Sequence, residues 1–529
     1  MGFAFTVAYI VLTIISPEQF GPEWASYHVL VYLALITALT SLPSVLTQSH
    51  LKSSVQTYLL VGFIIAIGAS QVANKWFGGA IQGWLTFLPS AAVYFFIVAN
   101  VTTIGRLKIV TLAVVASVLA LVGEALCGYY GGFLGETFVM NFRYSSHDQM
   151  TEQIFRLRGV GFLNDPNDFA QMLLIAIPLI FVVWRHGRVI VNSFLVIVPA
   201  GVLLWATYLT HSRGALIALA VLSLMAARKK LGTAGSIALA SVLAIGLLVV
   251  DFTGGRGISA SEGGDRLEAW ATGLELFKHA PIFGIGFGRF TDFNEITAHN
   301  SIVLCLAELG LVGATIWLAL LVTTTMDLSG LIALRGEPAL TDGDYDEASD
   351  PPAAEGDAET VLDSTSDADQ ATPVEDQWRD GEHELPTESN SPNASRMEEQ
   401  TSTEYGDDQI QNHFTETPPF LTSWATKTEV VAVSAVATPI ETESIYEPIV
   451  PSDWLIAIRL ALVSFMATSW FLSRTYSTTM YLVLGLATAA IALEPSSGGT
   501  RDRSRWIPVT LGVEGLAIVF IYFIVRFRR

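Results

Sequence analysis

The chain has 529 residues, of which 51% are hydrophobic and only 15% are charged. Soluble globular domains are typically about 25% charged, so this composition excludes an ordinary soluble protein. The formal net charge of −20 is a local feature, because residues 337–450 hold 28 acidic and three basic residues, and the rest of the chain holds 26 basic and 21 acidic residues.

Long apolar stretches recur along most of the chain. A bilayer core about 30 Å thick requires about 20 mostly apolar residues per spanning helix, because lipid offers no hydrogen-bond partner to an exposed backbone. The sequence therefore predicts an all-α polytopic membrane protein with about 12–13 transmembrane helices. The predicted spans lie near 2–16, 26–46, 55–72, 83–104, 107–127, 169–184, 189–210, 213–228, 232–251, 298–325, 453–471, 476–493 and 506–525.

Basic residues in the short loops predict the orientation, because Lys and Arg are retained on the cytoplasmic side. They occur in alternate loops, which gives a cytoplasmic N-terminus and outward loops at 128–168, 211–213 and 252–297. The side of the C-terminus stays open, because basic clusters lie on both sides of the last span. The loop residues used are Arg106, Lys108, Arg185, Arg188, Arg228, Lys229 and Lys230, and the two terminal clusters are Arg501, Arg503, Arg505 and Arg526, Arg528, Arg529.

The predicted domain organisation has three parts. Residues 1–325 contain ten transmembrane helices with the outward loops, and residues 453–529 contain the C-terminal transmembrane helices. Between them, residues 326–452 are acidic and rich in Ser, Thr and Pro, a composition that buries too little apolar surface to offset the entropy of ordering. We expect a disordered cytoplasmic insert there.

Neither a metal site nor a nucleotide site is predicted. Cys127 and Cys305 fall within or at the end of predicted spans, which favours packed thiols over a disulfide or zinc ligands. The glycines of residues 284–288 resemble a phosphate-binding loop, but they lack the flanking strand and helix of a dinucleotide fold.

Four outward features carry side chains suited to chemistry. Arg158 precedes the span at 169, Arg213 lies in a tight turn, and Arg266 opens a predicted amphipathic helix that runs to about residue 278. An arginine near the membrane plane suits phosphate oxygens, because its planar fork matches their geometry. His299 lies where the outward loop enters the next span, with Glu295 one helical turn earlier, and an imidazole with a pKa near 6.5 is largely neutral at pH 7.

Each feature also has a purely structural interpretation. Residues 164–168 have the pattern of a helix N-terminus, with Asp or Asn as the cap and Pro near the first turn. Arg158 would also suit an interfacial position with its stem along apolar surface, and a lone histidine is more often structural than catalytic. Glu308, nine residues after His299, falls on the opposite helix face and is not predicted to join it.

Taken together, these segments resemble the O-antigen ligase superfamily of bacterial membrane glycosyltransferases, which also includes O-antigen and exopolysaccharide polymerases. The resemblance covers residues 150–325 well and rests on the order and outward placement of several motifs. These motifs are Arg158-Gly159-Val160-Gly161-Phe162, Pro166-Asn167-Asp168-Phe169-Ala170, Ser212-Arg213-Gly214-Ala215, Asp265-Arg266-Leu267-Glu268-Ala269-Trp270, Pro281-Ile282-Phe283-Gly284-Ile285-Gly286-Phe287-Gly288, His299-Asn300-Ser301 and Glu308-Leu309-Gly310-Leu311-Val312-Gly313.

The resemblance implies a GT-C-like enzyme of the bacterial inner membrane. It would move a glycan from undecaprenyl pyrophosphate to a hydroxyl of an acceptor glycan or lipid, with inversion, without a metal or other cofactor, and without a nucleic-acid partner. His299 would activate the acceptor, and Arg158, Arg213 and Arg266 would bind the pyrophosphate. Glu295, Arg289 and Asn300 are possible supporting residues.

Three alternatives stay open, and one of them is a purely structural or sensory membrane protein, for which the acidic insert is the best argument. A polymerase of the same superfamily breaks the same donor bond and differs only in its acceptor. A transporter or flippase is also polytopic, but it should show inverted repeats or several ionisable residues near the bilayer midplane, where this sequence offers mainly Glu124 and Glu308.

Overall fold

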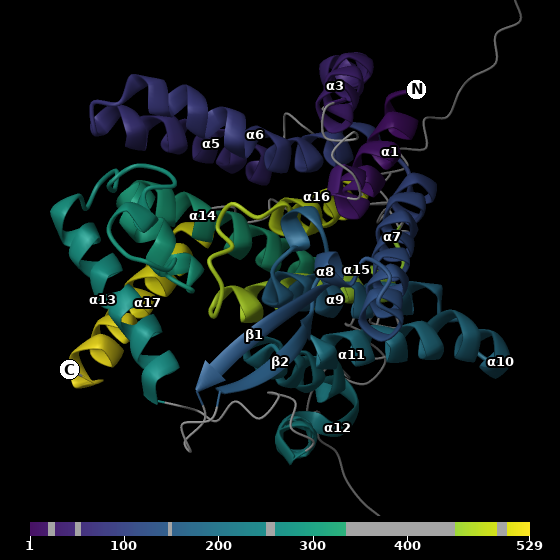
Figure 1. Ribbon diagram of the computed structural model, residues 1–529. Coiled ribbons are helices and arrows are strands. Elements are labelled where there is room, and N and C mark those ends of the chain that lie inside the picture. Colours follow the sequence, from purple (N-terminus) through teal and green to yellow (C-terminus); the bar gives the residue numbers. More distant parts are fainter. Residues whose placement is uncertain are drawn as a thin grey trace, which may run out of the picture. The chain divides into compact units, whose positions relative to one another are not determined.

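The computed structural model describes residues 1–19, 27–47, 54–145, 151–249, 260–334, 450–494 and 505–528. These residues are mostly helical, with one two-stranded sheet (Figure 1). The helices are α1 (Gly2–Ile15), α3 (Val29–Thr47), α5 (Val55–Ala73), α6 (Phe77–Asn100), α7 (Ile104–Gly131), α8 (Gly135–Phe138), α9 (Pro166–Ile180), α10 (Val189–Asn192), α11 (Val198–Leu209), α12 (Arg213–Val249), α13 (Ala260–His279), α14 (Ser301–Leu334), α15 (Ser452–Ser469), α16 (Thr478–Leu493) and α17 (Trp506–Arg528). The strands are β1 (Val139–Ser145) and β2 (Thr151–Leu157), and the short turns of helix are η1 (Pro17–Gln19), η2 (Gly161–Leu163), η3 (Phe181–Val183), η4 (Ser193–Ile197) and η5 (Phe290–Asp292).

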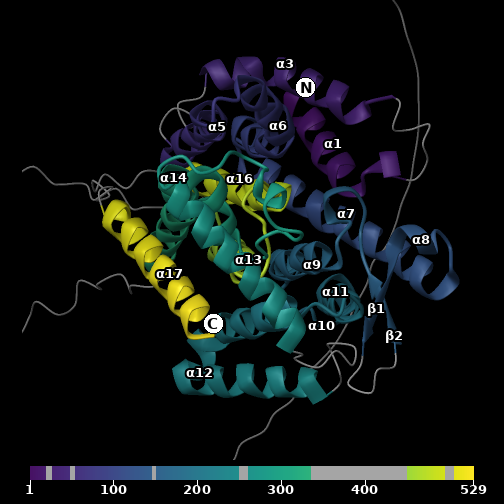
Figure 2. The same cartoon turned by 60° about the vertical axis from the view of Figure 1, so that its left-hand side comes forward.

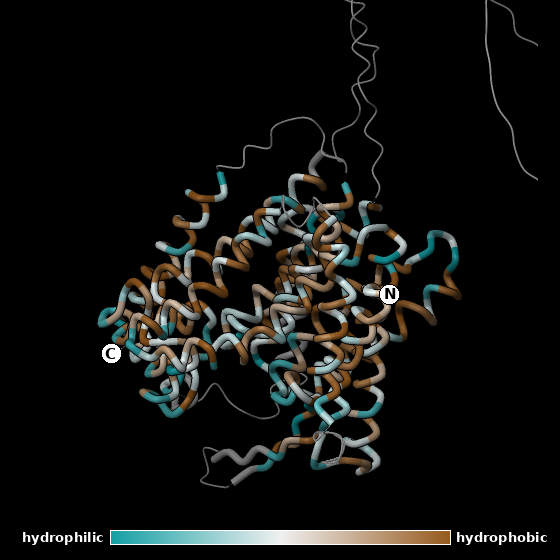
Figure 3. Tube along the Cα trace, turned by 90° about the horizontal axis from the view of Figure 1, so that it is seen from above, coloured by the Kyte–Doolittle hydropathy of each residue, from teal (hydrophilic) through white to brown (hydrophobic). Residues whose placement is uncertain are grey.

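The predicted fold class is confirmed. Among the described residues, ten helices are long and apolar enough to cross a membrane, and α16 is a shorter apolar helix. The two spans predicted within 213–251 form the single element α12, which is interrupted at Gly232, where the backbone leaves the helical conformation. Hydrophobic residues dominate the helices, and hydrophilic residues gather mainly in the loops and at helix ends (Figure 3).

The predicted boundary of the acidic insert differs from the structure at one end. Helix α14 continues to Leu334, beyond the predicted end at residue 325. The extension includes Asp327, whose carboxylate accepts a hydrogen bond of 2.8 Å from the Gln56 side chain of α5. This hydrogen bond gives the carboxylate a partner in a neighbouring helix, beyond the predicted end of the span. Residues 335–449, where the insert is predicted, lie outside the described residues.

A β-hairpin occupies part of the outward loop that was expected at 128–168. Strands β1 and β2 pair antiparallel, with Val139 opposite Leu157, and Figure 1 shows the hairpin beside α11, which β2 contacts. The hairpin is anchored at its open end, where Ile154 and Leu157 are buried. It therefore brings the chain that follows β2 against the helix bundle.

Contacts between helix ends agree with the predicted alternation of loops. On the face predicted to be cytoplasmic, Lys108 lies over the ring of Trp454. On the opposite face, the Asn74 side chain donates to the carbonyl of Gly284 at 2.9 Å, and Asn300 donates to the carbonyl of Trp470 at 3.0 Å. The loops predicted to face outward therefore gather on one side of the bundle.

The position of α17 favours one of the two arrangements left open for the C-terminus. Its C-terminal half packs against α13 (Figures 1 and 2), and Phe520 lies 5.8 Å from the ring of Trp470. Both partners belong to the face of the outward loops. Arg526 then follows a span that ends on this face, so the terminal basic cluster is the one that departs from the charge rule.

Helix α14 is broken at Gly310, and a loop fills the break. At this point the amides of Leu311 and Val312 donate to the carbonyls of Pro281 and Ile282, at 2.8 and 3.2 Å. In return, the freed carbonyls of Ala307 and Glu308 accept hydrogen bonds from the loop amides of Ile285 and Gly286, at 2.9 and 3.0 Å. Four backbone groups of α14 beside the break are thus paired, which is a requirement inside a membrane protein.

Candidate active site

His299 lies directly before α14, in a position fixed by its neighbour. The side-chain oxygen of Asn300 accepts hydrogen bonds from the amides of Ile302 and Val303, at 2.9 and 3.0 Å, and so caps the helix. His299 itself is half-buried and has a left-handed backbone with φ of 45°. This conformation costs a non-glycine residue about 1–3 kcal/mol, and the cap made by Asn300 holds the backbone that follows it in place.

The loop at residues 470–477, between α15 and α16, completes this corner of the molecule. The Ser301 hydroxyl donates to the carbonyl of Leu472 at 2.6 Å and accepts from the amide of Arg474 at 2.8 Å. The Thr475 hydroxyl donates to the Ser301 carbonyl at 2.8 Å. A segment of the chain far from His299 in sequence is therefore bonded to the first residues of α14.

The electrostatic environment of His299 favours its neutral form. Burial lowers the pKa of the imidazole, and the nearby positive charges of Arg266 and Arg474 lower it further, whereas Asp165 acts in the opposite direction. A neutral imidazole can accept a proton. The structure thus brings Arg266 into the surroundings of His299, as the sequence predicts, and adds Arg474 and Asp165.

Arg158 binds backbone carbonyls of α8 and is not among the described residues that act on the pKa of His299. Its guanidinium donates to the carbonyls of Thr137 and Glu136, at 2.9 and 2.7 Å, and so holds α8 against the end of β2. The neighbouring arginine, Arg156, is buried and contacts two other segments of the chain. It donates to the carbonyl of Thr210 and to the side chain of Asn167, at 2.9 and 3.0 Å. Arg156 therefore links the hairpin to the Arg213 turn and to the start of α9.

The remaining predicted residues have separate surroundings. Arg213 is half-buried in the first turn of α12, and Glu295 is exposed. Arg289 forms an ion pair of 3.0 Å with Asp292 and lies over the ring of Phe293. Asn300 supports His299 as a helix cap, which is a positional role.

Asp165, the acidic residue that acts on the pKa of His299, caps α9 as its sequence pattern indicates. Its side chain accepts from the amide of Asn167 at 2.8 Å, with Pro166 at the first helical position. Asp168, one turn further on, is buried and forms an ion pair with Arg474. The capping interpretation therefore holds for Asp165, whereas Asp168 has a partner that local sequence did not suggest.

Glu308 has a structural role on its own face of α14. Its buried carboxylate accepts hydrogen bonds from the amide of Phe290 at 3.0 Å and from the Tyr476 hydroxyl at 2.8 Å. It thus joins η5 and the 470–477 loop to the helix. Among the described residues, no group of three or more His, Cys, Asp or Glu side chains has a metal-binding arrangement.

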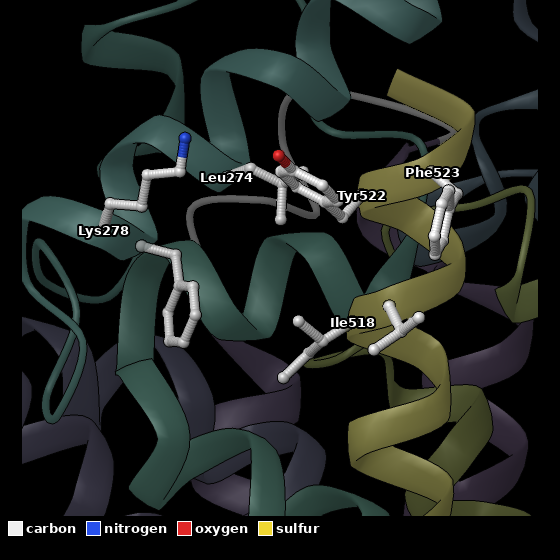
Figure 4. Close-up of a pocket in the computed structure, with 7 residues that line it drawn as sticks. Leu274, Lys278, Ile518, Tyr522 and Phe523 are labelled. Atoms are coloured by element: carbon white, nitrogen blue, oxygen red, sulfur yellow. The ribbon is translucent and has the colours of Figure 1, made fainter. Parts of the chain in front are cut away.

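An apolar cavity of about 290 Å³ lies between α13 and the C-terminal half of α17 (Figure 4). Its lining is apolar apart from the side chains of Lys278 and Tyr522, which Figure 4 shows at its edge. None of the predicted site residues lines it. The lining residues are Leu274, Phe277, Lys278, Ile518, Val519, Tyr522 and Phe523.

These features define a multi-pass helical membrane protein in which α13 and the 470–477 loop bring the positive charges of Arg266 and Arg474 into the surroundings of the half-buried His299. Residues 198–318 match the family model described as O-antigen ligase, a segment that includes Arg213, Arg266 and His299. No curated protein matches the chain. The chain thus carries an O-antigen ligase domain, and the superfamily predicted from its motifs is confirmed. Its function is ligase- or polymerase-like, in surface polysaccharide biosynthesis, with lipid-linked glycans as substrates.

Proposed function

We propose that the protein transfers a glycan from undecaprenyl pyrophosphate to an acceptor hydroxyl at the outer face of the bacterial inner membrane. The observation that carries this proposal is the fixed position of His299, with a lowered pKa and the positive charges of Arg266 and Arg474 around it. A base beside cations is what the reaction requires, because a proton leaves the acceptor while negative charge develops on the pyrophosphate.

In this mechanism, the imidazole of His299 takes the proton of the acceptor hydroxyl. The hydroxyl oxygen attacks the anomeric carbon of the first sugar, and the bond from that carbon to the pyrophosphate oxygen breaks. Undecaprenyl pyrophosphate leaves with its charge stabilised by Arg213 and Arg266. A single displacement inverts the anomeric configuration. Arg158 supports the site indirectly, because the carbonyls of α8 already bind its guanidinium.

The proposal is tested with the full-length protein in lipid nanodiscs, an undecaprenyl-pyrophosphate-linked glycan, a candidate acceptor and a chelator. We expect the glycan to appear on the acceptor as undecaprenyl pyrophosphate is released. An enzyme that transfers glycan only after a divalent cation is restored would contradict the metal-independent mechanism. Failure to cleave the donor with any acceptor, including the donor glycan itself, would contradict the proposed function.

The acceptor separates a ligase from a polymerase, because both break the same bond in the donor. In cells that lack the gene, loss of a ligase should leave long polymer on the lipid carrier. Loss of a polymerase should leave single repeat units. The glycan released from the carrier lipid by mild acid and sized by electrophoresis distinguishes the two, and we expect the ligase pattern.

The lowered pKa of His299 predicts how activity depends on pH. The base acts in its neutral form, so the rate should persist below the pH at which an ordinary histidine becomes protonated, and should fall as the pH passes below the lowered pKa. Asp165 raises that pKa, so Asp165→Asn should shift the acid limb of the kcat profile to lower pH. Asparagine caps helices as well as aspartate does, which preserves α9. An acid limb that stays in place or moves to higher pH would contradict the assignment of His299 as the base.

A further inference from the structure

Arg474 is the cation that the 470–477 loop contributes to the neighbourhood of His299. Its guanidinium forms an ion pair with Asp168, in the first turn of α9. The Asp168 side chain is only 8% exposed, whereas that of Arg474 is 24% exposed. The carboxylate therefore lies on the inner side of the pair, and part of the arginine remains accessible.

The ion pair uses only part of the binding capacity of Arg474. A guanidinium has five N–H donors in a planar fork, and the contact with Asp168 is made by Nη2. The Nε atom is buried and makes no hydrogen bond to any residue that the structure describes. A buried donor is costly unless it finds an acceptor, and a phosphate group offers acceptors that match the fork.

The position of Arg474 is defined by the same residues that fix His299. Its backbone amide donates to the Ser301 hydroxyl, two residues beyond His299. Its charge acts on the imidazole together with that of Arg266. Arg266 and Arg474 therefore approach His299 from two different elements, α13 and the 470–477 loop.

We propose that Arg474 binds the pyrophosphate of the lipid-linked donor and that Asp168 is the positioning residue that presents its guanidinium. This inference rests on the proposed function. It adds to the site a cation from outside the segment that matches the O-antigen ligase family model. The anionic donor would displace water from the accessible part of the Arg474 guanidinium, while Asp168 keeps its ion pair with Nη2.

A purely structural ion pair is the competing explanation, and a charge swap separates the two. If the pair only fastens the loop to α9, then Arg474→Gln and Asp168→Asn should be equally harmful, and the double variant Asp168→Arg/Arg474→Asp should restore function. If Arg474 binds the donor, the double variant restores the ion pair but carries a carboxylate where the phosphate needs a cation. It should then remain defective.

The experiment measures binding of labelled undecaprenyl pyrophosphate to the full-length protein in nanodiscs, beside the KM for donor and kcat of glycan transfer. We expect Arg474→Gln to raise the Kd at least about tenfold, which is the loss of one charge-assisted hydrogen bond. Arg474→Lys should recover part of the affinity, because it keeps the charge and loses the fork. Asp168→Asn should weaken binding less than Arg474→Gln does. Arg106→Gln, on the opposite face of the bundle, should bind the lipid as the native protein does.

Native affinity in Arg474→Gln, or restored affinity in the double variant, would overturn the assignment. Thermal unfolding of each variant identifies any that fails to fold. If Arg474→Gln fails to fold, the affinity of Arg474→Lys for the lipid is compared with that of the native protein instead. If the native protein binds the lipid pyrophosphate with this dependence on Arg474 but transfers no glycan, the proposed function fails and the anion site stands. If it does not bind the lipid at all, both proposals are wrong.

Discussion

Replacing His299 with alanine is expected to lower kcat for glycan transfer by about 10²–10⁴-fold, the usual contribution of a positioned general base. Binding of undecaprenyl pyrophosphate should change little, because the cations that surround the imidazole remain. The fold should also persist, since the cap of α14 is made by Asn300. Single-turnover transfer at saturating donor, with a chelator present, measures the effect.

His279 provides the matched control for this substitution. It is an exposed histidine at the end of α13, and its ring contacts the carbonyl of Glu275 in the same helix at 2.8 Å. His279→Ala should transfer glycan at the native rate. If His299→Ala is as active as His279→Ala, then His299 is not the base.

Substitution of Gly284 with alanine is expected to prevent normal folding, because it should lower the free energy of unfolding by about 3 kcal/mol or more. Gly284 has a positive φ of 68°, and an added Cβ would overlap the backbone of Glu308 at the break in α14. The loop would have to leave the break and expose the carbonyls that it pairs. Gly310→Ala should act in the same way, because its Cβ would meet the backbone of Ile282. Yield after detergent extraction and the thermal unfolding temperature are the measurements.

Gly123→Ala is the control, because Gly123 is helical and an added Cβ there meets nothing within 4 Å. Alanine is the better helix former, so this variant should be as stable as the native protein or slightly more stable. A Gly284→Ala protein that unfolds at the same temperature as Gly123→Ala would show that the loop does not need to enter the helix break.

Hydropathy alone predicted nearly all of the membrane helices, because a spanning segment must satisfy its backbone within itself and must present apolar side chains to lipid. The same constraint does not apply outside the bilayer, and there the secondary structure was predicted less completely. The β-hairpin was expected as a loop. Part of the signal was present, because Met140, Phe142 and Tyr144 alternate with polar residues along β1, which is the periodicity of a strand.

The candidate site was predictable in its location and only partly in its membership. The basic residues of the cytoplasmic loops placed the loops with Arg266 and His299 on the opposite face, and in the structure the charge of Arg266 acts on His299. The choice between Arg156 and Arg158 depends on how the hairpin meets the bundle, which local sequence does not specify. Arg474 was missed because its partner, Asp168, lies in α9, 306 residues earlier in the chain, and only the packing of the helices makes the two residues neighbours.

Because the surroundings of His299 include the 470–477 loop, the candidate site can be completed only late in the synthesis of the chain. During translation, Asp168 and Glu308 are synthesised long before Arg474 and Tyr476, the residues that pair with them. Until α15 and α16 have been inserted, both carboxyl groups must stay hydrated or protonated, since an unpaired charge in this environment is costly. A nascent chain that has reached only the end of α14 therefore holds His299 without the loop that fixes it. Under the proposed function, the protein would become a competent enzyme only after α15 and α16 have been inserted.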